Sequence, residues 1–274
     1  MNDVKSDCFI SSVLYILDIW DKEYLTKSIL SLTYDFYYNA NWKTLDDTII
    51  YCYLKDDILE ALCSCGIYCC KKNMSALELS SNSFNINEMC MLIIDGYECS
   101  WHQAYQKYHV DHYLVLKKME RHKIIVVDPF YEGKEFELDN KFGLKQVIFR
   151  NMHKEQKKTH IKKELNKDKY LNDLNLFCDD LLFISDQLLN YNSKFETIQF
   201  LRDIKSIVYS KYNLMKVFGN KSEITVQCKG LINQWEVLLS RLIYIALTKK
   251  IQKENLKEIG KNIKQQEKEL LQYL

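Results

Sequence analysis

The pattern of hydrophobic and polar positions divides the chain into two parts. Over the first 150 residues, apolar side chains recur at helical spacing in three stretches and then gather in short runs of strand length. From Tyr170 to the C-terminus the spacing is helical throughout. Between these parts, 151–169 is strongly basic and nearly free of hydrophobic residues. We therefore predict an α+β domain over 1–150, a basic linker over 151–169 and an all-helical domain over 170–274.

Three helices followed by short strands are predicted in the first domain. The first helix starts after a cap at Ser6 or Asp7, with apolar positions recurring over 10–20, and the other two have apolar positions over 25–36 and 54–65. Apolar runs between turn residues predict strands at 67–70, 89–94, 113–116, 123–127, 136–138 and 146–149. The run at 89–94 is continuously apolar and is expected to be a central strand. An aromatic run from Tyr34 to Trp42 is expected to contribute to the core.

The second domain is predicted to be a helical bundle. Apolar stripes at helical spacing run through 171–188, 200–214 and 231–245. The tail, 249–274, intersperses apolar residues with many charges, which predicts an exposed amphipathic helix or the arm of a homodimer. We expect no catalytic side chains in this domain.

Composition narrows the classes of function. The chain of 274 residues is 47% hydrophobic, enough for a sizeable core, and its formal charge is +1. Binding to nucleic acid as the main activity is disfavoured, because phosphate contacts need a clustered basic excess. No run of about 18 apolar residues occurs, and the N-terminus lacks the pattern of a secretion signal. We therefore expect a cytoplasmic protein without a membrane partner.

The ten cysteines are expected to be reduced thiols rather than a disulfide framework. Four of them cluster at Cys63, Cys65, Cys69 and Cys70. Zinc sites usually pair their ligands two to four residues apart in two separated knuckles, and this cluster instead straddles a predicted helix end at Gly66. Core packing is the favoured interpretation, and we expect no metal and no cofactor.

One cysteine lies at a position suited to chemistry. Cys8 falls in the first turn of the first predicted helix, and Ser6 or Asp7 is a suitable cap for that turn. Unsatisfied backbone N–H groups and the positive end of the helix dipole favour a thiolate there, and the thiolate is the nucleophilic form. The alternative is that Cys8 is simply a small core residue.

A histidine and an aspartate flank a predicted hairpin. His112 opens the strand 113–116, and Asp128 closes the strand 123–127 after a charged turn. The two side chains are expected to lie close together, so that the carboxylate holds the imidazole while its other nitrogen faces a thiol. Pro129 follows directly and restricts the exit of the strand. His109 is the alternative general base, without the following strand or an Asp-Pro partner.

These residues carry a resemblance to a known family. Asp7-Cys8 opens a helix, His112-Tyr113-Leu114-Val115-Leu116 opens a strand, and Asp128-Pro129 ends the next strand 16 residues after His112. In these motifs the first 150 residues or so resemble the papain-like peptidases that trim double-glycine leader peptides from bacteriocins.

The resemblance implies a papain-like α+β fold with Cys8, His112 and Asp128 as a catalytic triad. The family has a glutamine six residues before the cysteine that helps to form the oxyanion hole, and here that position is Asn2. The glycine that usually follows the cysteine is Phe9. The resemblance therefore implies an oxyanion role for Asn2, with a shorter amide and a bulkier neighbour than the family has.

Two further sets of residues are candidates for binding. The segment 96–111 is rich in aromatic residues and precedes His112, and Trp101, His102 and Tyr105 are candidates for a substrate pocket. The basic segment is a candidate dock for an acidic carrier protein, through Lys157, Lys158, Lys162 and Lys163.

Three functions compete. The layout, a papain-like domain followed by a helical domain, is similar to stand-alone relatives of the leader peptidases, the butirosin acyltransferase and the closthioamide amide ligase. That similarity implies an acyltransferase of nonribosomal peptide or other natural-product biosynthesis. It would move an acyl or peptidyl chain from a carrier-protein thioester, whose phosphopantetheine belongs to the substrate, through Cys8 to a small amine. The alternatives are a cysteine protease that cleaves a double-glycine leader and a non-catalytic binding module.

Overall fold

A computed structural model gives the fold of the chain. It describes residues 7–22, 25–40, 48–74, 88–119, 123–139, 144–151, 165–190, 194–218, 222–250 and 253–274. The fold is α+β, and the chain divides into two compact units. The first comprises Met1–Ile29 and Lys55–Ile161, and the second comprises Leu30–Leu54 and Lys162–Leu274. Helix α2 (Thr26–Leu32) spans the first boundary.

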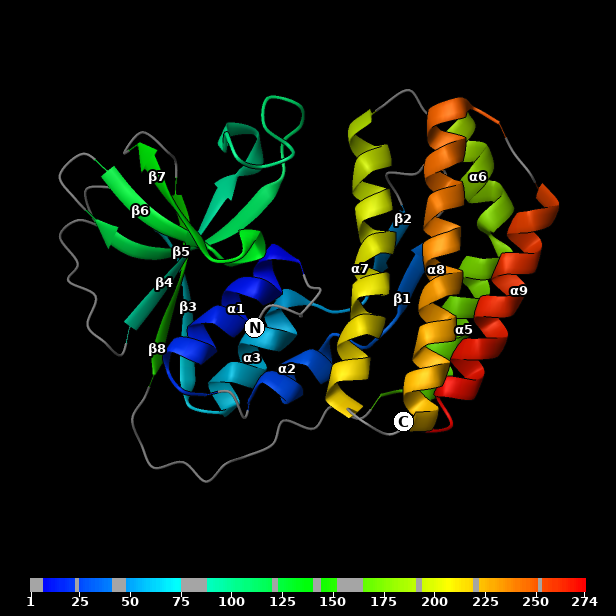
Figure 1. The fold of residues 1–274 in the computed structure, drawn as a ribbon, viewed down its shortest axis with the longest axis horizontal. Coiled ribbons are helices and arrows are strands. Elements are labelled where there is room, and N and C mark those ends of the chain that lie inside the picture. The colour runs from blue at the N-terminus through cyan, green and yellow to red at the C-terminus, as the bar shows by residue number, and fades with distance from the viewer. Residues whose placement is uncertain are drawn as a thin grey trace. The chain divides into compact units, whose positions relative to one another are not determined.

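Within the described residues, the first unit holds a six-stranded sheet and the α-helices α1 and α3 (Figure 1). The strands follow the order β3-β8-β4-β5-β6-β7, and every neighbouring pair is antiparallel. Their bounds are β3 Ile67–Met74, β4 Glu88–Asp95, β5 Asp111–Met119, β6 Lys123–Asp128, β7 Lys134–Asp139 and β8 Leu144–Asn151. Helix α1 (Cys8–Ile19) packs on β5, and α3 (Lys55–Ser64) packs on β3.

The predicted strands and the first and third predicted helices are confirmed, whereas the helix predicted over 25–36 ends at Leu32 as α2. The apolar run at 89–94 is β4, which lies inside the sheet between β8 and β5 and is buried at Met91 and Leu92. Continuous apolarity is what a strand covered on both faces requires. The hairpin is β5 and β6, and all six predicted strands are present with longer bounds. Most strands are longer than predicted because polar residues continue them at their ends, and these residues do not add to the hydrophobic pattern.

In the part of the chain that the structure describes, the second unit combines the helices α5 to α9 with a two-stranded sheet. The helices are α5 Lys167–Asp179, α6 Leu181–Asn190, α7 Lys194–Phe218, α8 Ser222–Thr248 and α9 Lys253–Leu270. The sheet pairs β1 (Tyr37–Ala40) with β2 (Thr48–Tyr51), and these strands pack on α5 and α7 (Figure 1).

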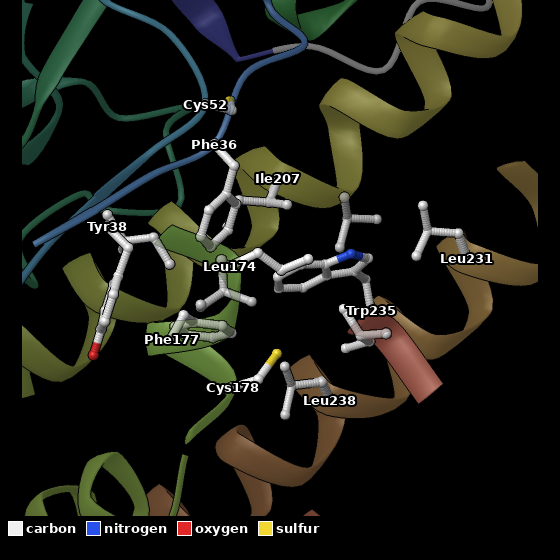
Figure 2. Packing of buried hydrophobic residues seen from close by; sticks show 14 of the residues in the cluster. Phe36, Tyr38, Cys52, Leu174, Phe177, Cys178, Ile207, Leu231, Trp235 and Leu238 are labelled. Atoms are coloured by element: carbon white, nitrogen blue, oxygen red, sulfur yellow. The ribbon is translucent and has the colours of Figure 1, made fainter. Parts of the chain in front are cut away.

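An aromatic cluster forms the centre of this second core. Trp235 of α8 is wholly buried, and its indole is stacked on Phe177 of α5 with ring centroids 5.7 Å apart. Phe36, directly before β1, approaches the same indole at 5.9 Å. Figure 2 shows the three rings gathered between the helices. The core of the helical unit therefore joins α8 to Phe36, which lies 199 residues before Trp235 in the sequence.

A charged pair is buried among these apolar residues. Lys211 of α7 and Glu267 of α9 are wholly buried, and Nζ lies 2.8 Å from Oε1. Lys211 also donates to the Tyr170 hydroxyl at 2.5 Å, while Trp235 Nε1 donates to the carboxylate at 3.0 Å. The Tyr34 hydroxyl donates to Oε2 at 3.0 Å. Because each charge has several partners, the network avoids the cost of an isolated buried ion.

The structure differs from the prediction in the bounds of the second unit and in the packing of its tail. The prediction assigned 30–54 to the first domain, whereas the structure groups Leu30–Leu54 with the helices. The tail was predicted to be an exposed helix or a homodimer arm, but α9 packs on α5, α6 and α8 within the second unit. Its apolar stripe, Leu256, Ile263 and Leu270, is buried there. Among the helices that the structure describes, none is long and apolar enough to cross a membrane.

Candidate active site

Cys8 is the first residue of α1, as predicted. Asp7 is the N-cap, with extended backbone, and its carboxylate accepts a hydrogen bond from the backbone N–H of Ile10 at 2.9 Å. The cap fixes the first turn and leaves Cys8, which is partly exposed, at the positive end of the helix dipole. Phe9 points into the core, where its ring meets the edge of Tyr113 at 5.3 Å.

His112 and Asp128 meet at the open end of the β5–β6 hairpin. His112 is the second residue of β5, and Asp128 is the last residue of β6. Nε2 of His112 lies 2.6 Å from Oδ2 of Asp128, and both side chains are wholly buried. The predicted contact between the imidazole and the carboxylate is therefore present.

The neighbouring Cys8 affects the protonation of His112. Burial alone would lower the pKa of His112, but the hydrogen bond to Asp128 and the neighbouring Cys8 thiol raise this pKa to about 9. Nδ1 of His112 has no protein hydrogen-bond partner within standard geometry among the described residues. Since Nε2 is occupied by Asp128, Nδ1 is the nitrogen available to the thiol. The arrangement supplies a nucleophile, a base and an orienting carboxylate in order.

Asp128 is held on both oxygens. Oδ1 accepts from the backbone N–H groups of Phe130 and Tyr131 at 3.1 and 3.3 Å, in the short 3₁₀-helix η4 (Pro129–Tyr131). Pro129 suits the start of η4 for two reasons. Its fixed φ is helical, and its lack of an N–H group costs nothing at the first position of a helix, where that group would have no partner within the helix. Oδ2 accepts from His112 and also from Nε1 of Trp101, at 2.9 Å.

The segment between β4 and β5 lies against this pair. It begins with the 3₁₀-helix η3 (Gly96–Glu98) and continues as turns up to β5. His102 is buried, and its ring centroid lies 4.4 Å from that of His112. Nδ1 of His102 accepts from the backbone N–H of Ala104 at 3.1 Å, which requires that nitrogen to be unprotonated. His102 therefore covers the imidazole of His112 as a packing partner.

The remaining candidates of this segment lie away from the thiol. Tyr105 is exposed, and its hydroxyl accepts a hydrogen bond from Gln106. His109, the alternative base, is exposed; its Nδ1 lies 2.5 Å from Oδ2 of Asp95, and its ring is stacked on Tyr97. The structure thus brings Trp101 and His102, but not Tyr105 or His109, to the His112–Asp128 pair.

Five candidate residues fall outside the described part of the chain: Asn2, Lys157, Lys158, Lys162 and Lys163. Within the described ranges, no group of three or more His, Cys, Asp or Glu side chains could hold a metal ion. The thiols of Cys63 and Cys69 interact, and burial together with Cys63 raises the pKa of Cys69.

Sequence reasoning missed one basic residue beside the site. Lys55, the first residue of α3, donates from Nζ to the Tyr113 hydroxyl at 2.8 Å and lies 4.6 Å from the centre of that ring. Desolvation opposes the charge, but Tyr113 and, more weakly, Asp7 and Cys8 raise the pKa of Lys55. Nothing in the sequence links Lys55 to Cys8, since they lie 47 positions apart and the segment Leu30–Leu54 of the second unit intervenes in sequence.

Comparison with models of known protein families gives no match, and comparison with curated proteins gives no relative.

Proposed function

We propose that the protein is a cysteine acyltransferase that forms an amide through an acyl thioester on Cys8, in a first unit with papain-like organisation. One observation carries the proposal. A wholly buried His112 is hydrogen-bonded to Asp128, and its pKa is also raised by Cys8, the first residue of α1 after the Asp7 cap. This combination of nucleophile, base and orienting group is what covalent acyl transfer requires.

The chemistry runs in two halves. His112 takes the proton of the Cys8 thiol, and the thiolate attacks the carbonyl carbon of a carrier-bound thioester. The carrier thiolate leaves and receives the proton from the imidazolium, so that Cys8 holds the acyl group. An amine then attacks the new thioester, His112 takes the proton of the amine, and Cys8 leaves as the amide forms. Asp128 stabilises the imidazolium in both halves.

Burial of the base favours transfer over hydrolysis. His112 and Asp128 have no exposed surface, and Trp101 and His102 cover them. A dry base disfavours activation of water and allows the acyl-enzyme to persist until the amine arrives. The partners of the proposed reaction are an acyl or peptidyl carrier protein and a small primary amine.

The test follows the fate of an acyl-carrier thioester. We expect the parent protein to form amide when a small primary amine is present, and free acid only slowly without it. Intact-mass spectrometry should detect acylation of Cys8. Rapid hydrolysis that the amine does not divert, or efficient cleavage of a double-glycine peptide, would establish the protease instead. A protein that is never acylated would be a binding module.

The matched variant is Cys8→Ala. We expect it to abolish acylation and turnover without loss of the fold, because the side-chain volume changes little at a partly exposed position. Circular dichroism and the urea transition check the fold. Activity within tenfold of the parent would remove Cys8 from the mechanism.

A further inference from the structure

Two donors converge on one oxygen of Asp128. Nε2 of His112 lies 2.6 Å from Oδ2, and Nε1 of Trp101 lies 2.9 Å from the same atom. The indole N–H can only donate, so Trp101 is the donor and Asp128 the acceptor whether or not His112 is protonated. Hydrogen bonds to an ionised acceptor are also stronger than neutral ones.

We propose that Trp101 is a positioning residue of the Cys8, His112 and Asp128 site: its indole N–H holds Oδ2 of Asp128 on the imidazole. This inference rests on the triad proposed above, but it does not depend on which acyl group or acceptor is used. Trp101 reaches neither the thiol nor the substrate in this role. It acts through Asp128.

The carboxylate needs this third support. The backbone N–H groups of Phe130 and Tyr131 hold Oδ1 from one side, at 3.1 and 3.3 Å. Rotation of the carboxyl group about Cβ–Cγ would carry Oδ2 away from His112, and those two contacts resist this rotation only through Oδ1. The indole N–H restrains Oδ2 itself. Because the site is wholly buried, Oδ2 would otherwise have His112 as its one donor, and the indole N–H supplies a second.

The indole is in turn fixed by packing. Its ring is stacked on Phe136 of β7, with centroids 4.0 Å apart and planes 6° apart. The segment that carries Trp101 is closed at its base by Asp95, whose Oδ1 accepts from the backbone N–H groups of Tyr97 and Val110 at 2.9 and 3.2 Å. The stack and the closed segment together fix the orientation of the Trp101 indole, so that its N–H points at Oδ2 of Asp128.

The contribution of the indole N–H can be separated from its bulk. Trp101→Phe keeps an aromatic ring for the stack on Phe136 and removes the donor. Phe136→Leu does the reverse, because it weakens the stack and leaves the N–H. Tyr105→Phe alters a hydroxyl of the same segment that bonds only with Gln106 among the described contacts.

The measurement is the rate at which iodoacetamide alkylates Cys8 as a function of pH, without any substrate. Cys8 is the only cysteine of the tryptic peptide 6–22, so mass spectrometry of that peptide separates it from the other nine. The titratable groups that face His112 are Cys8 from α1, Asp128 from β6, His102 from the preceding segment and Tyr131 from η4, while Cys99 interacts with Asp128.

We expect Trp101→Phe to lower the alkylation rate near pH 7 by about tenfold, the value of one hydrogen bond to a charged group. The upper limb of the profile, where the imidazolium loses its proton, should also move to lower pH. The reason is that a carboxylate that turns away stabilises the imidazolium less. Phe136→Leu and Tyr105→Phe should keep the upper limb of the parent.

A fourth variant separates this inference from the proposed function. His112→Ala should lower the rate near pH 7 to that of a cysteine without a histidine partner; a profile equal to that of the parent would overturn the triad itself. If His112→Ala behaves as expected but Trp101→Phe leaves the upper limb in place or moves it to higher pH, Trp101 only packs and the present inference fails.

Discussion

At the scale of the residue, the environment of His112 determines the chemistry. Its imidazole is wholly buried, which by itself would favour the neutral form. Asp128 and the Cys8 thiol reverse this preference and raise the pKa to about 9. The same histidine at the surface would be a weak base at neutral pH. The protonation of His112 is therefore set by its neighbours. The same neighbours make the free energy of unfolding depend on pH.

That dependence has a definite sign. The pKa of His112 in the folded protein, about 9, exceeds the ordinary value of 6.5, so folding binds the proton more tightly. The resulting stabilisation is fully present below about pH 6.5 and is lost as the pH rises through about 9. We expect the difference in free energy of unfolding between the parent and His112→Gln to shrink by up to about 3 kcal/mol across this window.

Urea titrations at intervals from pH 6 to pH 10 measure this difference. His109→Gln is the matched control, because it removes an exposed imidazole that also contacts an aspartate. A difference between the parent and His112→Gln that stays constant with pH would contradict the assigned environment of His112.

At the scale of the element, the first turn of α1 places Cys8, the proposed nucleophile. Asp7 caps the helix through the backbone N–H of Ile10, and Cys8 follows directly. We expect Asp7→Ala to lower the free energy of unfolding by about 1 kcal/mol and to slow alkylation of Cys8, since the turn that carries the thiol would fray. Asp7→Ser, which retains a capping oxygen, should preserve both. Equal behaviour of the two variants would show that the cap is not needed.

The helices α7 and α9 are joined by the buried pair of Lys211 and Glu267. Lys211→Met should destabilise the protein by about 3–5 kcal/mol, because it leaves a buried carboxylate without its counter-charge. Adding Glu267→Gln should recover most of this loss, since the neutral amide oxygen can still accept from Trp235. The urea midpoints of the parent, the single and the double variant measure the effect. A double variant no more stable than Lys211→Met would argue that the charge is not the cause.

At the scale of the whole molecule, one segment determines how the chain can be divided. The strands β1 and β2 and the residues around them belong to the helical unit, although they lie between two pieces of the first unit in sequence. Tyr34, Phe36 and Tyr38 are buried in the core of that unit. A cut at the predicted linker therefore separates these aromatic side chains from their core.

This makes a prediction for fragments. The fragment 1–161 should aggregate, because it carries the aromatic residues of 34–38 without the helices that bury them. The same fragment with 33–54 replaced by a glycine-serine linker should be monomeric and folded. Size-exclusion chromatography and circular dichroism compare the two. Equal solubility of both fragments would contradict the division into units.

The sequence alone determined the local structure and the residues of the candidate triad. Period and turn signals located α1, β4 and the β5–β6 hairpin, and the spacing of His112 and Asp128 across that hairpin implied their contact, because a hairpin brings its open ends together. Asp7 was recognisable as a cap for the same local reason. These features depend on interactions between residues near one another in the chain.

The tertiary structure alone decided what depends on distant parts of the chain. Trp101 was predicted as a candidate for a substrate pocket. Its hydrogen bond to Asp128 depends on the path of the segment between β4 and β5, and the hydrophobic pattern of the sequence does not predict that path. The helix α9 looked like an exposed arm, because its stripe is sparse and its partners lie on α5, α6 and α8. The segment 30–54 joined the helical unit because Phe36 is buried against Trp235, about 200 residues later, and side-chain packing of that kind leaves no local signal.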